Sequence, residues 1–255
     1  MSSYDLFMEN FYAMSIMLTR APKGSLLNIS SAIIASSGLP FDDENFLLFG
    51  PSANAIHIDC AVGLMPGVGV PFSVPVFSNT DPFMPLLVKD KVACSESSHH
   101  VMALSRSGAF EFDKCCELVD EGSIEEFAET VWKGFGTKGK VSEEYLEFAR
   151  YLLSSPFNRL FILRNPRKKA VSCALLCDSG SSCGVYYFAT LPRSRRKGFA
   201  RRLMSSVASV AFEKYESLVL LSTEDGFPFY SAFGFEDLGV LPVLHCPKLE
   251  GWHNF

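Results

Sequence analysis

The sequence predicts an α+β fold in which a mixed, mostly antiparallel central sheet is flanked by helices. Between about residue 110 and residue 248, well-marked elements follow one another in the order β-α-α-β-β-β-α-β-α-β. This order of elements indicates the α+β class with a mixed sheet. With 255 residues, of which 48% are hydrophobic, the chain can bury one large core or two smaller ones.

The first elements of this series are a strand and two helices. Alternating hydrophobicity predicts a strand at 110–119. A helix is expected at 122–136, where Ser123 and Glu126 have the spacing of a capping box and the apolar residues share one face. A second helix is expected at 142–156, between an N-cap serine and a terminating proline.

The remaining elements of this half follow in close succession. A wholly apolar strand is typical of burial on both faces, and a glycine after a short helix is typical of its C-terminal cap. The expected strands are 159–165, 170–178, 184–191, 217–223 and one or two within 237–246, and the expected helices start at Gly198 and span 228–235.

Residues before 110 are richer in Ser, Pro and Gly, which predicts a domain boundary there, with domains at 1–109 and 110–255. In this first domain the patterns predict two helices and four strands. The expected helices are 3–18 and 82–90, and the expected strands are 30–38, 46–50, 55–62 and 70–77.

Composition favours a soluble cytoplasmic protein. No signal peptide or membrane-spanning run is visible, and the net charge is -5. The eight cysteines show no spaced framework, so we expect reduced thiols used as small apolar residues. The pairs Cys115/Cys116 and His99/His100 are adjacent, and neighbouring residues of a strand point to opposite faces, so we expect no metal site.

Basic residues gather where a helix should begin, in the stretch "LPRSRRKGFARRLM" at 191–204. A helix N-terminus carries roughly half a unit of positive charge and unpaired N–H groups, so it disfavours cations and binds anions. Gly198 allows close approach of an anion to the backbone. The residues Arg193, Arg195, Arg196, Lys197, Arg201 and Arg202 are therefore in place for a bound phosphate.

Known phosphate motifs narrow this hypothesis. The sequence holds no G-x-x-x-x-G-K-[ST] string, which excludes a Walker-type loop. The glycines in "GLMPGVGVP" at 63–71 have the wrong spacing for a dinucleotide site, so we interpret that stretch as a Gly/Pro loop.

The same stretch resembles the signature of the GNAT superfamily of N-acetyltransferases, in which a strand is followed by R-x-x-G-x-G/A at a helix start. That motif falls on Arg195, Gly198 and Ala200, and "FYSAFGF" resembles the family's Y-x-x-x-G-F element at Tyr230. The resemblance covers 110–248 and implies the acyl-CoA N-acyltransferase fold. It also raises the alternative that residues 1–109 are a degenerate tandem copy that binds no cofactor.

The resemblance implies acetyl-CoA (coenzyme A) as cosubstrate and no metal. Backbone amides of the loop would bind the pyrophosphate, and the end of strand 184–191 would pair with the pantetheine arm. That strand would splay from 217–223 to admit the arm. The implied cofactor-binding residues are Ala189, Leu191, Arg195, Arg196, Lys197, Gly198, Phe199, Ala200 and Arg201.

Catalysis requires a proton for the leaving thiolate and a neutral amine. Tyr230 matches the position where the family often has a tyrosine near the sulfur, so it is the candidate general acid. The alternative is that Tyr230 only packs as an aromatic residue of the last helix. No carboxylate lies on 184–191, and Glu224 and Asp225 form an ordinary turn, so the general base stays open.

The leading function is N-acetyl transfer to a primary amine of a small molecule, an amino acid or a protein. An inactive CoA-binding GNAT-like module is the alternative. A nucleic-acid binder is disfavoured because the basic residues are confined to one loop of an acidic chain. We expect no membrane partner; the acceptor amine and the oligomeric state stay open. Phe135, Trp132 and Tyr145, on the first two helices, are expected in the core.

Overall fold

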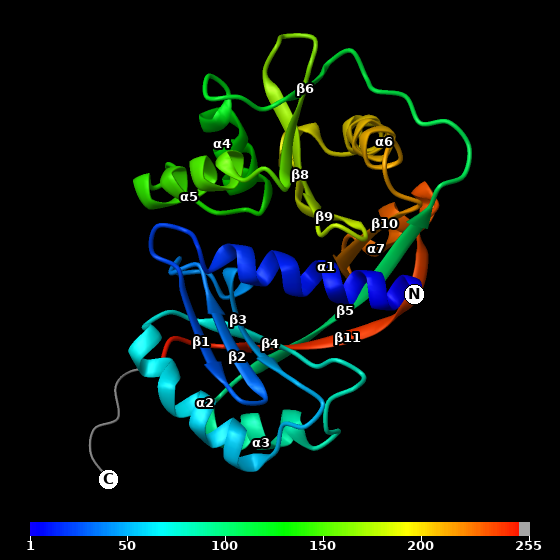
Figure 1. Ribbon diagram of the computed structural model, residues 1–255. Coiled ribbons are helices and arrows are strands. Elements are labelled where there is room, and N and C mark those ends of the chain that lie inside the picture. The colour runs from blue at the N-terminus through cyan, green and yellow to red at the C-terminus, as the bar shows by residue number, and fades with distance from the viewer. Residues whose placement is uncertain (250–255) are drawn as a thin grey trace. The chain divides into compact units, whose positions relative to one another are not determined.

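A computed structural model describes residues 1–249 (Figure 1). The chain forms two compact units, which are not consecutive halves. Unit 1 consists of Met1–Phe11 and Val101–Leu238, and unit 2 consists of Tyr12–His100 and the residues from Gly239 on. The expected division at 109/110 differs from these units at both ends, because the chain enters each unit twice and a composition shift cannot show such an exchange.

The sheet of unit 1 is mixed and mostly antiparallel, as the sequence predicts. Its strand order is β6-β7-β8-β9-β10, followed by the part of β5 that lies in this unit. Consecutive strands pair antiparallel from β6 to β9, and β9 and β10 pair in parallel. The strands are β5 (Ser95–Ser105), β6 (Cys116–Leu118), β7 (Asn158–Arg164), β8 (Ala170–Asp178), β9 (Cys183–Thr190) and β10 (Ser217–Thr223).

Helices cover both faces of this sheet. Figure 1 shows α4 and α5 on one side of β8 and β9, and α6 on the other. The buried face of α6, with Leu203 and Val207, packs against Phe161 of β7 and Leu176 of β8. The helices are α4 (Ile124–Gly134), α5 (Glu143–Ser154), α6 (Phe199–Ala211) and α7 (Phe227–Phe233), with the short 3-10 turn η2 (Pro192–Ser194) before α6.

The two helix starts predicted from serine caps have different outcomes. Ser142 caps α5 by accepting a hydrogen bond from the Tyr145 N–H at 3.2 Å. Ser123 makes no such bond to α4; its hydroxyl donates to Asp120 Oδ1 at 2.6 Å. The capping box predicted at 123–126 is therefore wrong. The Ser123 hydroxyl is hydrogen-bonded to Asp120, and the Glu126 carboxylate is paired with Arg164.

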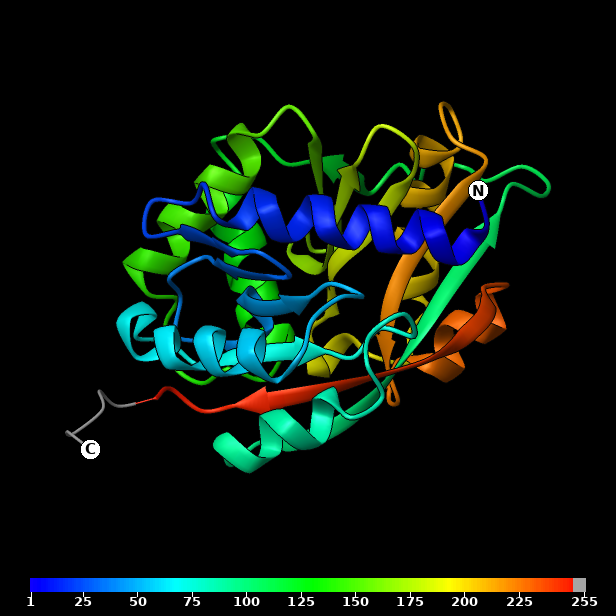
Figure 2. The ribbon, with the colours of Figure 1, turned by 60° about the horizontal axis from the view of Figure 1, so that its bottom comes forward.

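Unit 2 has its own core and contains the other strands of the sheet. Its strand order is β1-β2-β3-β4-β11, with the remaining part of β5 beyond. Helices α2 and α3 cover one face, which Figure 2 brings forward, and Ile58 and Val88 pack there against Phe72. The elements are α1 (Ser3–Leu18), β1 (Ser25–Ile29), β2 (Ala32–Ser36), η1 (Asp42–Glu44), β3 (Asn45–Phe49), α2 (Ala55–Val68), β4 (Phe72–Pro75), α3 (Met84–Lys91) and β11 (Glu236–Cys246).

Three local predictions were wrong. Residues 55–62 form the start of α2, because Asn54 caps a helix there, and a short apolar run does not distinguish a strand from a buried helix. The glycines at 63 and 67 lie inside that helix, which ends at Gly69 with φ 74°, so the expected Gly/Pro loop starts only there. The strand expected at 110–119 is limited to β6, which starts after a turn at Asp113.

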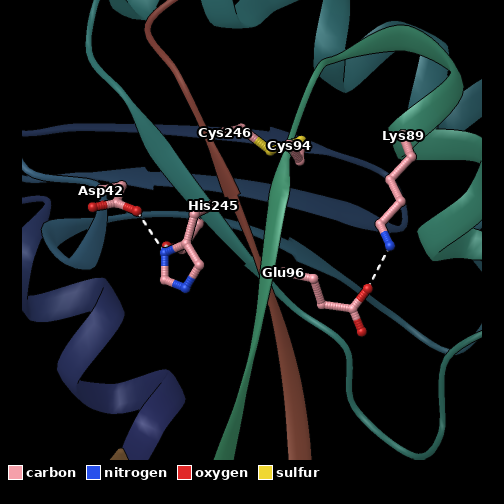
Figure 3. The surroundings of a disulfide bond; sticks show 7 residues. Asp42, Lys89, Cys94, Glu96, His245 and Cys246 are labelled. Atoms are coloured by element: carbon pink, nitrogen blue, oxygen red, sulfur yellow. Dashed lines mark hydrogen bonds and ion pairs between the residues drawn. A yellow bond between two sulfur atoms is a disulfide. The ribbon is translucent and has the colours of Figure 1, made fainter.

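The expectation that all cysteines are reduced was also wrong. Cys94 and Cys246 form a disulfide, with a Cα–Cα distance of 4.5 Å across 152 residues of sequence (Figure 3). The other six cysteines are free thiols. Spacing could not reveal the pair, because the sheet brings its strands together. Of the helices in residues 1–249, none combines the length and hydrophobicity that crossing a bilayer requires.

The start of α1 is fixed to unit 1 by Asn10, which is fully buried. Its amide donates to Cys177 O at 3.0 Å and to Ser182 O at 3.3 Å, and its Oδ1 accepts from the Tyr186 hydroxyl at 2.8 Å. A Cβ on Gly184 would lie 1.9 Å from that oxygen. The hydrogen bonds of Asn10 therefore require a residue without a side chain at position 184.

Gly184→Ala should destabilise the protein by about 1–3 kcal/mol, because the new methyl group collides with the Asn10 amide. Asn10→Ala alone should cost about 1–3 kcal/mol through unsatisfied buried groups. The double variant should lose less than the sum of the two, since Asn10→Ala removes the amide that the new methyl group at 184 would meet. Urea unfolding followed by circular dichroism measures all three. Additive losses, or a stable Gly184→Ala variant, would contradict the contact; Gly122→Ala, where a Cβ meets only Asp120 Oδ1 at 3.5 Å, is the control.

Candidate functional site

The candidate site begins where β9 leaves β10. The two strands pair in parallel at Cys183–Leu218 and Gly184–Val219. Within the described residues the register stops there, although β9 continues to Thr190 and β10 to Thr223. The later part of β9 therefore has an open edge on the side of β10, which agrees with the expected splay.

A bulge in β9 accompanies this departure. Cys173 of β8 is opposite Ala189 and Leu175 is opposite Tyr186, so one residue of β8 faces two residues of β9. Tyr187, the first of these two, has φ 49°, a left-handed conformation that is unusual for a residue with a side chain. A bulge bends its strand and redirects the following residues, which accounts for the separation from β10.

The basic loop after β9 leads into α6 through two left-handed residues. Arg196 has φ 61° and Gly198, the N-cap of α6, has φ 80°. A Cβ at Gly198 would meet no atom within 4 Å, so the space in front of it is open. The first helical bond joins the Arg202 N–H to Gly198 O at 3.2 Å. In the part of the chain that the structure describes, the backbone N–H groups of 196–201 donate to no protein acceptor.

Most of the basic side chains are held by the protein itself. Lys197 donates to Arg193 O at 2.6 Å, and Arg201 donates to Ala232 O at 3.3 Å, which joins the first turn of α6 to α7. Arg202 forms a bidentate pair with Asp113, at 2.7 and 2.9 Å. This pair lowers the pKa of the Asp113 carboxyl, chiefly through the hydrogen bond from Arg202.

Arg195 braces the loop. Its guanidinium donates to Gly134 O, at the end of α4, at 2.8 Å and to Thr190 O at 3.1 Å. Gly134 also lies against β9, since a Cβ there would be 2.6 Å from the Ala189 Cβ. Arg195 therefore holds the loop to α4 and β9. The Arg193 and Arg196 side chains are exposed and form no hydrogen bond or ion pair within residues 1–249, so they are the cations left for a ligand.

Two backbone groups at the end of β9 are bonded toward β8. The Leu191 N–H donates to Val171 O at 2.9 Å, and Ala189 O accepts from the Ser172 hydroxyl at 2.7 Å. Backbone groups of successive strand residues point to opposite edges. The backbone groups of Phe188 and Thr190 therefore point to the edge beside β10, where Thr190 O already accepts a hydrogen bond from Arg195.

Tyr230 lies on α7 in an aromatic cluster. Its ring centroid is 5.9 Å from that of Phe188, 5.1 Å from Phe229 and 5.5 Å from Phe235. Burial raises the pKa of the Tyr230 phenol above its usual value of about 10, so the phenol stays protonated at neutral pH. Among the described residues its hydroxyl has no hydrogen-bond partner. A Cβ at Gly226 would be 3.1 Å from the ring, so glycine makes room for it.

Glutamates at the first turns of α4 and α5 pair with arginines. Glu126 pairs with Arg164 at 2.8 Å, and Arg150 pairs with Glu125 and Glu143. Tyr145 is buried and packs against the partly buried Trp132, as expected for a core residue. Phe135 is 62% exposed, so the expectation that it lies in the core was wrong. It follows the last residue of α4 as the C-cap of that helix.

Sequence reasoning missed two contributors to this region. Phe188, at the bulge, stacks on Phe229 at 5.7 Å and links the open strand edge to α7. Asp113 holds the second turn of α6 through Arg202. The adjacent aromatic residues Phe229 and Tyr230 in "GFPFY" were a signal that another aromatic residue, such as Phe188, packs against them. The second could not be found, because 89 residues separate Asp113 from its partner.

Comparisons with known proteins agree with this geometry. Residues 124–235 match the model of the acetyltransferase (GNAT) family. A GCN5-related N-acetyltransferase from Kribbella flavida aligns with a TM-score of 0.66 at 14% identity, over 94% of this chain and 96% of that chain. A conserved protein of unknown function from Staphylococcus epidermidis aligns with a TM-score of 0.62 at 10% identity, over 88% and 93%.

A GCN5-related N-acetyltransferase from Sphaerobacter thermophilus gives a TM-score of 0.57 at 13% identity, over 86% of this chain and 78% of that chain. No curated protein matches the sequence. At these identities the structural likenesses show the fold. The chain therefore has the mixed, mostly antiparallel acyl-CoA N-acyltransferase fold that the sequence predicts.

Arg195→Ala should lower the free energy of unfolding by about 1–2 kcal/mol, because a charged donor to two backbone carbonyls is lost. Arg195→Lys should not restore it, since an ammonium cannot span both carbonyls as a planar fork does. Arg193→Ala is the matched control and should stay within about 0.5 kcal/mol. Thermal unfolding measures the three variants. Equal unfolding free energies of Arg193→Ala and Arg195→Ala would show that the hydrogen bonds of Arg195 do not stabilise the loop.

Proposed function

Because residues 124–235 carry a GNAT acetyltransferase domain, we propose that the protein transfers an acetyl group from acetyl-coenzyme A to a primary amine of a small molecule, an amino acid or a protein. The observation that carries this proposal is the run of unpaired backbone N–H groups at 196–201, which lies directly after the open edge of β9. That combination fits an extended ligand with a phosphate group at one end.

The start of α6 is suited to the pyrophosphate of coenzyme A. Unpaired N–H groups and the positive end of the helix dipole both favour an anion at this place. Gly198 leaves the approach open, and the free side chains of Arg193 and Arg196 add positive charge. The amides of Arg196, Lys197, Gly198, Phe199, Ala200 and Arg201 would hold the phosphate oxygens.

The open edge of β9 is suited to the amide-containing pantetheine arm. Phe188 and Thr190 direct their backbone groups to this edge, whereas Ala189 and Leu191 are bonded toward β8. We therefore assign the pairing to Phe188 and Thr190, one residue from the positions that the family resemblance implies. Ala189 contributes by packing against Gly134, which keeps α4 close to the strand.

Tyr230 is the proposed general acid. Bound acetyl-coenzyme A supplies an activated thioester, whose transfer to an amine leaves a thiolate that needs a proton. The Tyr230 hydroxyl carries that proton at neutral pH and has no protein partner to compete for it. Its ring contact with Phe188 holds it beside the open part of β9. A bound water is the proposed base, since β9 contains no carboxylate.

Unit 2 supports the hypothesis of a degenerate second copy. The series β1-β2-β3-α2-β4 repeats the pairing of β7-β8-β9-α6-β10, with two antiparallel pairs and then a parallel pair across a helix. The first turn of α2 is closed, however. Asn54 Oδ1 accepts from the N–H groups of Ile56 and His57, at 3.1 and 3.3 Å. We therefore propose one coenzyme site per chain, at α6.

The missing strand carboxylate favours one alternative, a module that binds coenzyme A without catalysis. Such a module would keep the phosphate site and the open strand edge. It differs from the enzyme in one measurable property: free thiol is not released with any amine.

Ala200→Asp should weaken coenzyme A binding by at least about tenfold, because a carboxylate in the first turn repels the pyrophosphate. The same change should leave the free protein as stable, or stabilise it by about 0.3–1 kcal/mol, because an acid is favourable at a helix N-terminus. Weaker binding in a variant that is at least as stable as the wild type would show that the binding site is lost while the fold is kept. Titration calorimetry with acetyl-coenzyme A and thermal unfolding measure the two quantities.

Ser209→Asp, in the last turn of α6, is the matched control and should bind normally. Wild-type protein should bind one equivalent per chain. Unchanged affinity in Ala200→Asp, or a second site of similar affinity, would refute the assignment to α6.

Tyr230→Phe should lower kcat by about 100-fold and leave the KM for acetyl-coenzyme A within about twofold, because only the proton donor is removed. Thiol release over a panel of amines measures both. Tyr215→Phe removes a hydroxyl that binds Asp178 and should keep kcat. Normal turnover in Tyr230→Phe would remove this residue from the mechanism; no turnover in the wild type, with binding intact, would favour the module.

A further inference from the structure

Unit 2 contains a hydrogen-bonded Ser–His–Asp chain. His245, on β11, lies 2.6 Å from the Ser97 hydroxyl through Nε2 and 2.6 Å from Asp42 Oδ2 through Nδ1. Asp42 comes from η1 and Ser97 from β5, and 203 residues separate Asp42 from His245. Figure 3 shows the Asp42 carboxylate facing the His245 ring, close to the Cys94–Cys246 disulfide.

These contacts determine which atom carries each proton. A carboxylate only accepts hydrogen bonds, so Nδ1 of His245 carries a proton and donates it to Asp42. In a neutral imidazole the other nitrogen, Nε2, is then the acceptor. The Ser97 hydroxyl therefore donates to Nε2, which is the arrangement of a nucleophile, its base and the group that orients the base.

The orienting carboxylate sits on a segment that buried groups hold in place. Asn45, which follows η1, is fully buried, and the two N–H groups of its amide are shared among three carbonyl oxygens, Leu39 O at 2.9 Å, Phe41 O at 2.7 Å and Pro71 O at 3.0 Å. These bonds fix the backbone on both sides of Asp42. Hydrogen bonds that fix the backbone beside a reactive group hold that group within a fraction of an ångström of its working position.

The chain of residues is accessible. The side chains of His245 and Asp42 are 24% and 33% exposed, and Ser97 is partly buried. His99, two residues from Ser97 on the same face of β5, places Nδ1 3.3 Å from the Ser97 oxygen. In its N–H form that nitrogen donates to the Ser97 oxygen, which leaves the hydroxyl hydrogen for Nε2 of His245. On β4, Ser73 lies opposite His245 and 3.4 Å from Nδ1, as a weaker contact.

A metal ion is the competing interpretation, because Asp42, Asp43 and His245 have ligand atoms within 4.8 Å of one another. Two ligand atoms on one tetrahedral zinc lie about 3.3 Å apart, given metal–ligand bonds of about 2.0 Å. The Nδ1–Oδ2 distance of 2.6 Å is instead that of a hydrogen bond. Both nitrogens of His245 are already used, which leaves none for a cation.

We propose that Ser97 is a nucleophile that accepts the acyl group of a small carboxylic ester, with His245 as its base and Asp42 as the residue that positions the base. This is an esterase site separate from the acetyltransferase site of unit 1. The Ser97 oxygen forms a bond to the ester carbonyl carbon while its proton passes to His245 Nε2. The ester C–O bond then breaks, and the leaving alcohol takes that proton.

Water completes the cycle. It attacks the acyl-serine, gives a proton to Nε2, and releases the carboxylic acid as the Ser97 oxygen recovers that proton. An alkyl fluorophosphonate stops the sequence at its first stage, since the Ser97 oxygen bonds to phosphorus, fluoride leaves and no water displaces the adduct.

The test treats the full-length protein with an alkyl fluorophosphonate and locates the adduct by peptide mass spectrometry. We expect one adduct per chain, on Ser97, and a burst of 4-nitrophenol from 4-nitrophenyl acetate. His245→Gln should slow labelling by about 100-fold, as for loss of a general base. Asp42→Asn, of nearly the same shape, should slow it by at least about tenfold, because an amide can hold the other imidazole tautomer.

Ser98→Ala is the matched control, because adjacent strand residues face opposite sides, and it should label at the wild-type rate. Circular dichroism of each variant reports whether it folds. No adduct on Ser97, equal labelling in folded His245→Gln, or labelling that requires added zinc would overturn the proposal. None of these outcomes bears on coenzyme A binding, which the α6 variants test separately.

Discussion

β9 separates from its parallel partner β10 after Gly184, and the rest of the candidate site depends on this separation. The left-handed Tyr187 and the bulge around it bend the strand where pairing stops. The bend leaves a backbone edge that β10 does not pair, directs β9 into the basic loop, and brings Phe188 against the α7 cluster that contains Tyr230. One local irregularity therefore positions the strand edge, the anion site and the proposed acid.

The basic residues before α6 divide between two tasks. Arg195, Lys197, Arg201 and Arg202 bind acceptors of the protein itself, so their charges shape the loop and join α6 to its neighbours. Arg193 and Arg196 stay available to a ligand. This division explains how a helix start tolerates so many cations: most are neutralised or hydrogen-bonded, and the open amides stay available to an anion.

Local patterns were enough to find the basic loop, Gly198 and the element order of unit 1, because strand, loop and helix are consecutive there. They failed at 55–62, where an apolar run fits strand and helix equally well until Asn54 is seen to cap a helix. They also failed for contacts between distant segments. The Cys94–Cys246 disulfide and the Ser97–His245–Asp42 chain exist only because β5, β11 and η1 meet in unit 2, and no spacing in the sequence encodes that meeting.

A crystal structure of the protein with coenzyme A tests the central claim most directly. The account predicts pyrophosphate oxygens at hydrogen-bond distance, about 2.7–3.2 Å, from backbone nitrogens within 196–201, and the pantetheine arm paired with Phe188 and Thr190. Coenzyme A bound in unit 2, or in unit 1 with its pyrophosphate away from these amides, would contradict the account.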